Sequence, residues 1–229
     1  MAFSKLYDSP AAAVADVSDG STVLIGGTTQ VSEPTGLLAA LENAGAGNLT
    51  CVWDFTGWDG ANGLLHLAAS GRVSRIISPS PFPEGAGDPI RDLVLTGALT
   101  VEVTPQGTLA ERLRAGGAGI GGVFVPVGLG TRFAEGKEVR VINGVECVLE
   151  APLRADYALL RAHRADTMGN LVYRGPQRGW NPAMATAARI SIAEVDHVGE
   201  PGTIDPELVI TPGIFVNRLA LVPVSGQEG

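Results

Sequence analysis

Short apolar runs alternate with amphipathic or alanine-rich segments along most of this chain. Four of the runs, at residues 22–25, 49–53, 73–77 and 100–103, contain many β-branched residues and are predicted strands. Continuous apolar strands of this kind are typical of sheets that are covered on both faces. Because the runs alternate with predicted helices, the pattern indicates one α/β domain over residues 1–229, with an open, mostly parallel sheet and helices on both faces.

The same alternation predicts the remaining elements. A helix is predicted after Thr108, which is expected to cap it, with Glu111 at the capping-box position. Asn143-Gly144 predicts an antiparallel hairpin of strands 138–142 and 146–150, because this dipeptide suits a two-residue turn. The other predicted helices cover residues 4–17, 35–43, 64–70, 90–96 and 181–188, and the other predicted strands cover residues 155–165, 171–174 and 191–195.

Glycine is concentrated between Arg114 and Thr131, where a predicted helix gives way to an apolar strand. Repeated glycine costs conformational entropy, so it favours positions of positive φ or of close backbone approach. Residues 117–122 fit G-x-G-x-x-G, but the dinucleotide fingerprint needs a strand before it and a helix after it. The order here is reversed, which excludes that site. A helix end that leads into a crowded strand and a loop that contacts a ligand remain equally open.

Charge and composition exclude several classes of partner. The net charge of −8 disfavours nucleic acid and anionic membranes, and no apolar run is long enough to span a bilayer. No leader pattern is found, so we expect a cytoplasmic protein. Cys51 and Cys147 lie in apolar surroundings and are expected to be buried, reduced thiols. The cysteines and the three scattered histidines give no metal-ligand spacing, so no metal site is expected.

Polar residues follow two of the predicted strands at their carboxyl ends, in residues 26–33 and 53–59. In open α/β sheets ligands bind beyond the carboxyl ends of the strands, so these segments are the expected ligand-facing rim. The sequence contains no G-x-S-x-G elbow and no phosphate-binding loop. Carboxylates are therefore the remaining candidate acids, bases or nucleophiles, and the sequence distinguishes none of them. The candidates are Glu33, Asp54, Asp59 and Glu102.

Several separated motifs follow one another along nearly the whole chain. They are DGSTVLIGG at 19–27 with Pro34, TPQGTLAERLRAGGAGI at 104–120, PVGLGT at 126–131, VLEAPLRADYALL at 148–160, ADTMGNLVYRG at 165–175 and DPELVITPGIFV at 205–216. In this order they resemble the A subunit of the family I coenzyme A transferases. The C-terminal half is most similar to the A subunits of 3-oxoadipate and succinyl-CoA:3-oxoacid CoA-transferases.

This resemblance implies one of the two related α/β chains, A and B, that build such an enzyme as a heterodimer or an A2B2 heterotetramer. A glutamate of the B subunit, in a Ser-Glu-Asn-Gly-like motif that this chain lacks, would attack the acyl-CoA thioester. CoA would then move to a carboxylic acid, expected to be a 3-oxo acid, by a ping-pong reaction with covalent intermediates. Coenzyme A would be a substrate, and no further cofactor or metal is expected.

The resemblance also implies roles for individual residues. Gln106 matches the family glutamine that faces the active site, where its amide would donate a hydrogen bond to the oxyanion or the substrate; a loop-tying amide is the alternative. The small residues at 26–27 and 117–119 would let the acyl group and the thioester approach the backbone closely. The expected substrate-binding residues are Gly26, Gly27, Thr28, Gln30, Glu33, Trp53, Asp54, Phe55, Gly117, Ala118 and Gly119.

The chain departs from the family pattern around the expected site. Thr28 and Ser32 stand where the family has Phe and Gly, and residues 53–55 read Trp-Asp-Phe instead of Ser-Asn-Asn. An aspartate repels a substrate carboxylate unless it is protonated or paired, and aromatic side chains favour apolar contact. We therefore expect a larger or more apolar acyl group than succinate. Two other functions stay open: a CoA-thioester or ring-cleaving hydrolase, in which Asp54 or Glu33 activates water, and a non-catalytic partner subunit.

Overall fold

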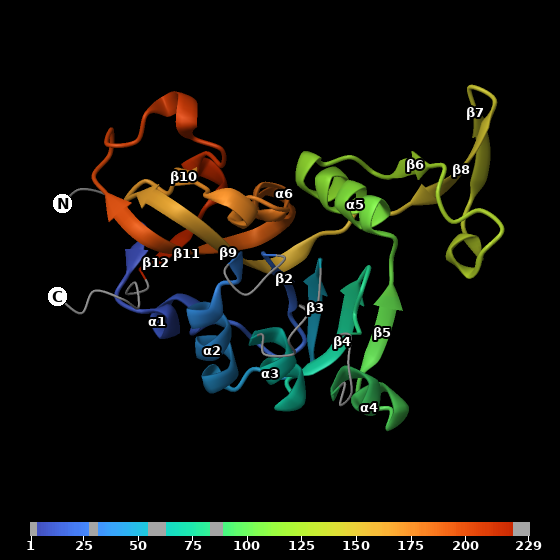
Figure 1. Cartoon of the computed structure of the whole chain (residues 1–229), viewed down its shortest axis with the longest axis horizontal. Coiled ribbons are helices and arrows are strands. Elements are labelled where there is room, and N and C mark those ends of the chain that lie inside the picture. The colour runs from blue at the N-terminus through green and yellow to red at the C-terminus, as the bar shows by residue number, and fades with distance from the viewer. Residues whose placement is uncertain (1–3, 28–31, 55–62, 83–88, 222–229) are drawn as a thin grey trace.

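The computed structural model describes residues 4–27, 32–54, 63–82 and 89–221. Within them the main sheet has nine strands in the order β1-β12-β11-β9-β2-β3-β4-β5, and β10 pairs with β9 (Figure 1). All pairs along this order are parallel, and only the β9–β10 pair is antiparallel. The strands are β1 (Leu6–Tyr7), β2 (Thr22–Ile25), β3 (Leu49–Trp53), β4 (Val73–Ser78), β5 (Thr100–Val103), β9 (Ala155–Asp166), β10 (Leu171–Val172), β11 (Ala188–Gly199) and β12 (Arg218–Leu221).

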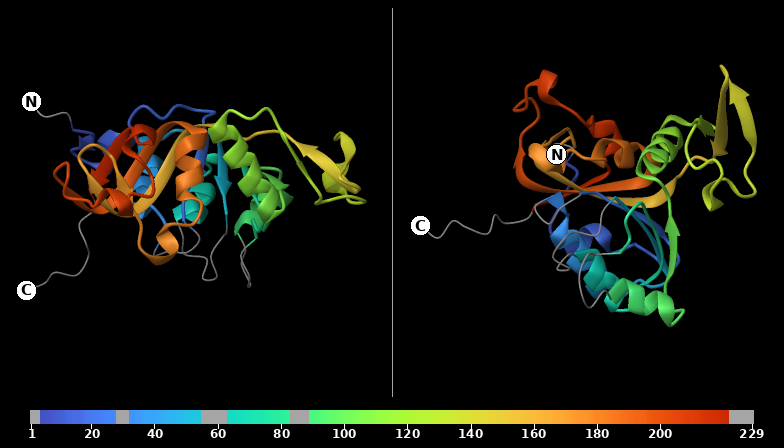
Figure 2. Two further views of the ribbon diagram at one scale, coloured as in Figure 1. Left: turned by 90° about the horizontal axis from the view of Figure 1, so that it is seen from above. Right: turned by 45° about the vertical axis from the view of Figure 1, so that its right-hand side comes forward.

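Helices cover both faces of this sheet, as Figures 1 and 2 show from three directions. Each face has its own apolar cluster, with Leu41 and Leu64 in one and Leu109 and Met184 in the other. Two covered faces explain why the central strands are apolar at almost every position. One face carries α1 (Pro10–Val14), α2 (Thr35–Ala44), α3 (Gly63–Ala69) and α4 (Pro89–Leu95), and the other carries α5 (Gln106–Ala118) and α6 (Asn181–Ala187).

A small antiparallel sheet stands away from the main body (Figure 1). It consists of β6 (Val123–Val125), β7 (Val139–Ile142) and β8 (Val145–Glu150). Asn143 and Gly144 form the turn between β7 and β8 with φ angles of 51° and 79°, as a two-residue turn of this type requires. The predicted hairpin is therefore confirmed. Short 3₁₀ helices lie at Arg132–Ala134, Gly175–Gln177, Pro206–Leu208 and Gly213–Phe215.

The order of the strands reverses between β2 and β9. From β2 the chain proceeds through β3 and β4 to β5, whereas from β9 it proceeds through β11 to β12 in the opposite direction. In open α/β sheets the crevice at the carboxyl ends of such a pair is the usual ligand site. β9 continues past the end of β2, because Ile25 is paired with Leu159 and β9 ends only at Asp166. At the switch point β9 therefore extends beyond the carboxyl end of β2.

The predicted fold class is confirmed, and most predicted boundaries agree closely with the structure. Three predictions are wrong in extent. The helix expected over 4–17 covers only α1, because Leu6 and Tyr7 pair with β12 and Ser9 caps the helix by accepting a hydrogen bond from the Ala12 amide at 3.1 Å. α5 begins at Gln106, so Thr108 lies inside the helix, buried, and does not cap it. β11 is longer than residues 191–195 because it pairs with β9 along most of its length.

Candidate active site

The carboxyl ends of β2, β3 and β5 bring together three of the predicted site segments. β2 ends before Gly26, β3 ends before Asp54, and Gln106 begins α5 two residues after Thr104. Gln106 donates a hydrogen bond from Nε2 to Asp54 Oδ1 at 2.8 Å. The structure therefore places these residues, which are distant in sequence, at one edge of the sheet. It also shows that one amide hydrogen of Gln106 is already directed at a carboxylate.

Asp54 is buried at this edge. Burial raises the pKa of its carboxyl, and the hydrogen bond from Gln106 opposes that rise without cancelling it. The predicted repulsion of a substrate carboxylate depended on an ionised, unpaired aspartate. Gln106 is neutral, so its hydrogen bond orients Asp54 without cancelling a negative charge, and the apolar acyl group stays a prediction.

Gly26 has a steric role inside the protein. A Cβ at this position would overlap the side chain of Asn181, which is fully buried at the first residue of α6. Asn181 Nδ2 donates to the carbonyl of Gln177 at 2.6 Å, and its Oδ1 accepts from the Arg161 amide at 3.2 Å. Asn181 thus links β9 to the 3₁₀ helix Gly175–Gln177 by hydrogen bonds and packs against the backbone at the end of β2. The sequence predictions did not include it, and the only available signal was an asparagine at the start of a predicted helix.

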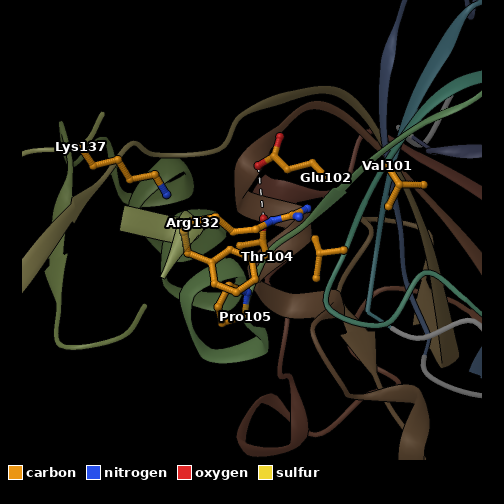
Figure 3. A pocket seen from close by; sticks show the side chains of 8 residues that line it. Val101, Glu102, Thr104, Pro105, Arg132 and Lys137 are labelled. Carbon is orange, nitrogen blue, oxygen red and sulfur yellow. Dashed lines mark hydrogen bonds between the residues drawn. The ribbon is translucent and has the colours of Figure 1, made fainter. Parts of the chain in front are cut away.

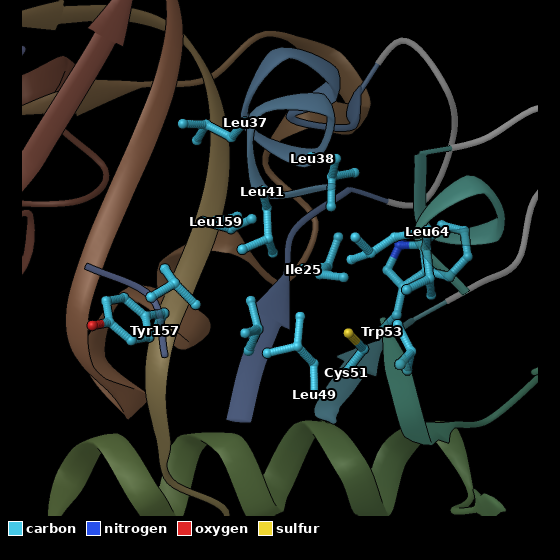
Figure 4. Packing of buried hydrophobic residues seen from close by; sticks show 14 of the residues in the cluster. Ile25, Leu37, Leu38, Leu41, Leu49, Cys51, Trp53, Leu64, Tyr157 and Leu159 are labelled. Atoms are coloured by element: carbon cyan, nitrogen blue, oxygen red, sulfur yellow. The ribbon is translucent and has the colours of Figure 1, made fainter. Parts of the chain in front are cut away.

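Trp53 is a core residue, so its prediction as a substrate-binding residue is wrong. Its side chain is fully buried among the helices of the first face, beside Cys51, Ile25 and Leu64 (Figure 4). The indole Nε1 donates to the carbonyl of Gly27 at 3.0 Å. Trp53 therefore acts on the site only by fixing the backbone of Gly27. Its side chain gives no support to an apolar acyl pocket.

Gly27 and Glu33 also have contacts within the chain. Gly27 has a φ of 99°, and a Cβ there would overlap the Ser32 carbonyl, so the turn needs glycine. Glu33 is buried and accepts a hydrogen bond from the Gly63 amide, at the start of α3, at 3.2 Å. Thr28, Gln30 and Phe55 lie outside the described residues, and so does Asp59.

Another buried carboxylate, Glu194 on β11, was not among the predicted site residues. It accepts a hydrogen bond from the Leu37 amide at 2.8 Å in the first turn of α2, where the helix dipole favours negative charge. Burial raises its pKa, whereas the amide hydrogen bonds and the charge of Arg161 act in the opposite direction. Glu194 fixes α2, and with it the end of the loop that follows β2.

Gly117, Ala118 and Gly119 lie at the other edge of the sheet. They form the C-terminal end of α5, which runs back from Gln106 towards the amino ends of the strands (Figure 2, left). A Cβ at Gly117 would overlap Thr186, just before β11 begins, and Gly119 ends the helix with a φ of 72°. The three residues line a cavity of about 530 Å³ there. The two glycine segments therefore lie at opposite edges of the sheet, and Gly119 ends a helix, as one interpretation of the stretch expected. Substrate binding by Gly117, Ala118 and Gly119 stays a prediction.

Glu102 belongs to an ion-pair network instead of standing free as an acid or base. It pairs with Arg112 at 2.9 Å and with Arg75, and it accepts a hydrogen bond from Thr104. Burial raises the pKa of Glu102, but the hydrogen bonds and charges of the two arginines outweigh burial and lower it overall. Beside this network lies a cavity of about 350 Å³ between β5 and the loop that bears Arg132 (Figure 3).

The described residues contain no group of three or more His, Cys, Asp and Glu side chains that could hold a metal ion. Cys51 and Cys147 are free and buried, as predicted. No helix in the described ranges is both long and apolar enough to cross a membrane.

Comparison with known proteins connects this architecture to a family. The coenzyme A transferase family matches residues 7–221. The chain is 46% identical over 223 residues to the A subunit of the 3-oxoadipate CoA-transferase of Pseudomonas putida, a match that covers 97% of this chain and 94% of that one. It is 45% identical over 214 residues to the A subunit of the succinyl-CoA:3-ketoacid coenzyme A transferase of Xanthomonas campestris pv. campestris (strain B100), covering 93% and 87%.

Solved structures share the fold at lower identity. The acyl-CoA transferase YdiF from Escherichia coli O157:H7 superposes with a TM-score of 0.83 at 21% identity, covering 100% of this chain and 49% of that one, so this chain spans about half of its length. Glutaconate coenzyme A-transferase from Acidaminococcus fermentans gives 0.78 at 22% identity, covering 96% and 76%. The decarboxylase AibA/AibB gives 0.80 at 23% identity, covering 96% and 84%, so the fold alone does not fix the reaction. By the match over residues 7–221 and the identity to A subunits over nearly its whole length, the chain belongs to the coenzyme A transferase family, as an enzyme subunit of the A type.

Proposed function

We propose that the chain is the A subunit of a heteromeric enzyme that moves CoA from an acyl-CoA to a 3-oxo acid. The single observation that carries the proposal is the identity of 46% over 97% of the chain to the A subunit of a 3-oxoadipate CoA-transferase. The relative from Xanthomonas is likewise named for a 3-ketoacid. We expect the enzyme to act in the cytoplasm, with coenzyme A as a substrate and no resident cofactor.

In this proposal the nucleophile is a glutamate of the B subunit. Its carboxylate attacks the thioester carbonyl, the thiolate of CoA leaves, and an acyl-glutamyl anhydride remains. The thiolate then attacks the glutamyl carbonyl, releasing the first acid and leaving a glutamyl-CoA thioester. The acceptor carboxylate then attacks the glutamyl-CoA thioester, the CoA thiolate leaves, and a second anhydride forms. The thiolate attacks the acceptor's carbonyl in this anhydride, which forms the new acyl-CoA and restores the glutamate carboxylate.

The role proposed for this chain is to stabilise the oxyanions of these steps. Gln106 begins α5 at the carboxyl edge, where its amide is oriented by Asp54. The carboxamide has two hydrogens, and the one that does not bind Asp54 is the donor for the oxyanion. Because Gln106 does not change its charge, it can act equally in every step.

The proposed partner is a B subunit, in an A2B2 assembly. The relatives are named as A subunits, which supports a second kind of chain. Exposed apolar side chains gather on the hairpin of β7 and β8, at Val139, Val141, Ile142 and Val145. A surface of this kind is typical of an interface that a partner covers.

Trapping of the intermediate tests the proposal. The chain is co-expressed with the adjacent B-like chain, incubated with an acyl-CoA and treated with borohydride or hydroxylamine, and both chains are examined by mass spectrometry. A modified glutamate on the partner is expected. Release of CoA without an acceptor acid and without an adduct on either chain would overturn the proposal.

A further inference from the structure

A cavity of about 370 Å³ opens at the carboxyl ends of β9 and β11. It is lined by Arg161, Arg174, Gly175, Pro176, Gln177 and Asp196. It lies one strand away from the point where the strand order reverses, since β9 borders both β2 and β11, and ligands of open α/β sheets bind near that point. Asn181 joins it to the candidate active site, because this side chain contacts Gly26 and bonds the backbone of both Arg161 and Gln177.

One residue that lines the cavity, Arg161, carries a positive charge that neighbouring carboxylates already compensate. The side chain of Arg161 is only 14% exposed and forms ion pairs with Asp196 and, at 3.7 Å, with Glu194. The second oxygen of Asp196 lies 3.1 Å from His163 Nδ1. Burial raises the pKa of Asp196, but its hydrogen bonds to His163 and Arg161 outweigh burial and lower it, so Asp196 stays ionised and occupied by its own partners.

The lining also includes a cation that has no carboxylate partner among the described residues, Arg174. Arg174 is exposed at the rim, and no carboxylate among the described residues forms an ion pair with it. Its backbone is fixed, because the Arg174 amide donates to Gln177 Oε1 at 3.1 Å and its carbonyl accepts from the Gln177 amide at 3.2 Å. A guanidinium on a fixed turn is well suited to bidentate recognition of a carboxylate or phosphate.

We infer that this cavity binds an anionic group of the substrate through Arg174, next to the reacting centre. The group is either the distal carboxylate of a dicarboxylic acyl group or a phosphate of coenzyme A, since both present oxygens that a guanidinium recognises. The inference rests on the proposed function, because it assigns a part of that substrate to a part of this chain. It differs from the apolar acyl group expected from residues 53–55, of which Trp53 is buried in the core.

Binding to the complex of this chain with its B subunit tests the inference. Affinities for succinate, butyrate, coenzyme A and 3′-dephospho-coenzyme A are measured by calorimetry for the wild-type complex and for Arg174→Gln. Loss of one charge-assisted contact is expected to weaken binding of one anion by about tenfold to a hundredfold. Weaker succinate binding with unchanged butyrate binding assigns the site to a distal carboxylate. Weaker binding of coenzyme A with unchanged binding of the dephospho form assigns it to the 3′-phosphate, and equal weakening of both forms assigns it to the diphosphate.

Two matched arginine variants complete the test. Arg178 is exposed on the same turn but does not line the cavity, so Arg178→Gln is expected to bind all four compounds as the wild type does. Arg132 lines the cavity beside β5, so a selective loss in Arg132→Gln would place the anion there and overturn the inference. Unchanged binding in Arg174→Gln, or no binding of any anion to the wild type, would also overturn it. Failure of the proposed function is seen separately, as absence of the glutamyl adduct, because these affinities need no turnover.

Discussion

The two edges of the main sheet use bare glycine in the same way but differ in chemistry. At the carboxyl edge Gly26 lies against Asn181, and at the amino edge Gly117 lies against Thr186. Both glycines allow a helix on the second face to approach the backbone more closely than a Cβ permits. The carboxyl edge adds a polar pair, in which the exposed Gln106 donates a hydrogen bond to the buried Asp54. Glycine by itself therefore identifies close packing, and the polar side chains that accompany it identify the candidate site.

The largest expected effect is on activity at the carboxyl edge. If the second amide hydrogen of Gln106 serves the oxyanion, Gln106→Ala lowers kcat by about 10²–10³, the usual loss for one such donor. Steady-state CoA transfer by the complex with the B subunit measures this effect. Asp54→Asn is the comparison, because it keeps a hydrogen-bond partner for Gln106 and should retain most of the activity. A twofold or smaller loss in Gln106→Ala would reduce Gln106 to a residue that only ties loops together.

The steric contact at the carboxyl edge is expected to dominate stability. Gly26→Ala forces Asn181 away from the carbonyl of Gln177 and the amide of Arg161, which leaves buried polar groups unsatisfied. We expect a loss of about 3 kcal/mol in the free energy of unfolding, from overpacking and lost hydrogen bonds together. Urea unfolding measures it.

A double-mutant cycle identifies the contact responsible. Asn181→Ala removes the overlapping atoms, so the loss in the double variant should be smaller than the sum of the two single losses by about 1–3 kcal/mol. Additive losses would mean that Gly26 is needed for a reason other than Asn181.

The same test at the amino edge uses Gly116→Ala. A Cβ at Gly116 would overlap the carbonyl of Leu153, whose amide donates to the Arg112 carbonyl at 2.8 Å, so the two backbones must separate. We expect a loss of about 2 kcal/mol with kcat per folded enzyme unchanged. Gly107→Ala is the matched control in the same helix, since a Cβ there meets nothing within 4 Å and should leave stability equal or higher. A fall in kcat for Gly116→Ala would connect the amino edge to catalysis.

The sequence predicted the elements far better than their contacts. β3 and β5 have the predicted boundaries, because a short run that contains β-branched residues and lies between turn residues leaves few alternatives. Trp53 was assigned to the site because it ends a strand, yet side chains alternate along a strand, and sequence position does not say which face is the core. Asn181 was missed because its contact with Gly26 joins segments far apart in the chain. Local patterns carry no information about such contacts.

The smallest expected effects are on the pH dependence of stability, which we compare for one aspartate near each edge of the sheet. Burial raises the pKa of Asp54, so the folded state binds its proton more tightly than the unfolded state does. Wild-type stability therefore falls as pH rises from the ordinary aspartate value of 3.8 through the raised pKa, and Asp54→Asn should be more stable than the wild type near neutrality. Asp16, before β2, shows the opposite shift, because the hydrogen bonds from Arg218 at 2.5 and 2.7 Å lower its pKa.

The contribution of Asp16 is present above its unfolded pKa and is lost as pH falls through the lowered one. Asp16→Asn should therefore be less stable than the wild type near neutrality, by less than about 1 kcal/mol because the carboxylate is half exposed. Both differences should vanish in acid, where the two carboxyls are protonated in folded and unfolded chains alike. Urea unfolding of both variants across this range measures the two differences. If both variants were more stable than the wild type, or both less stable, burial of Asp54 and pairing of Asp16 would not have opposite effects on stability.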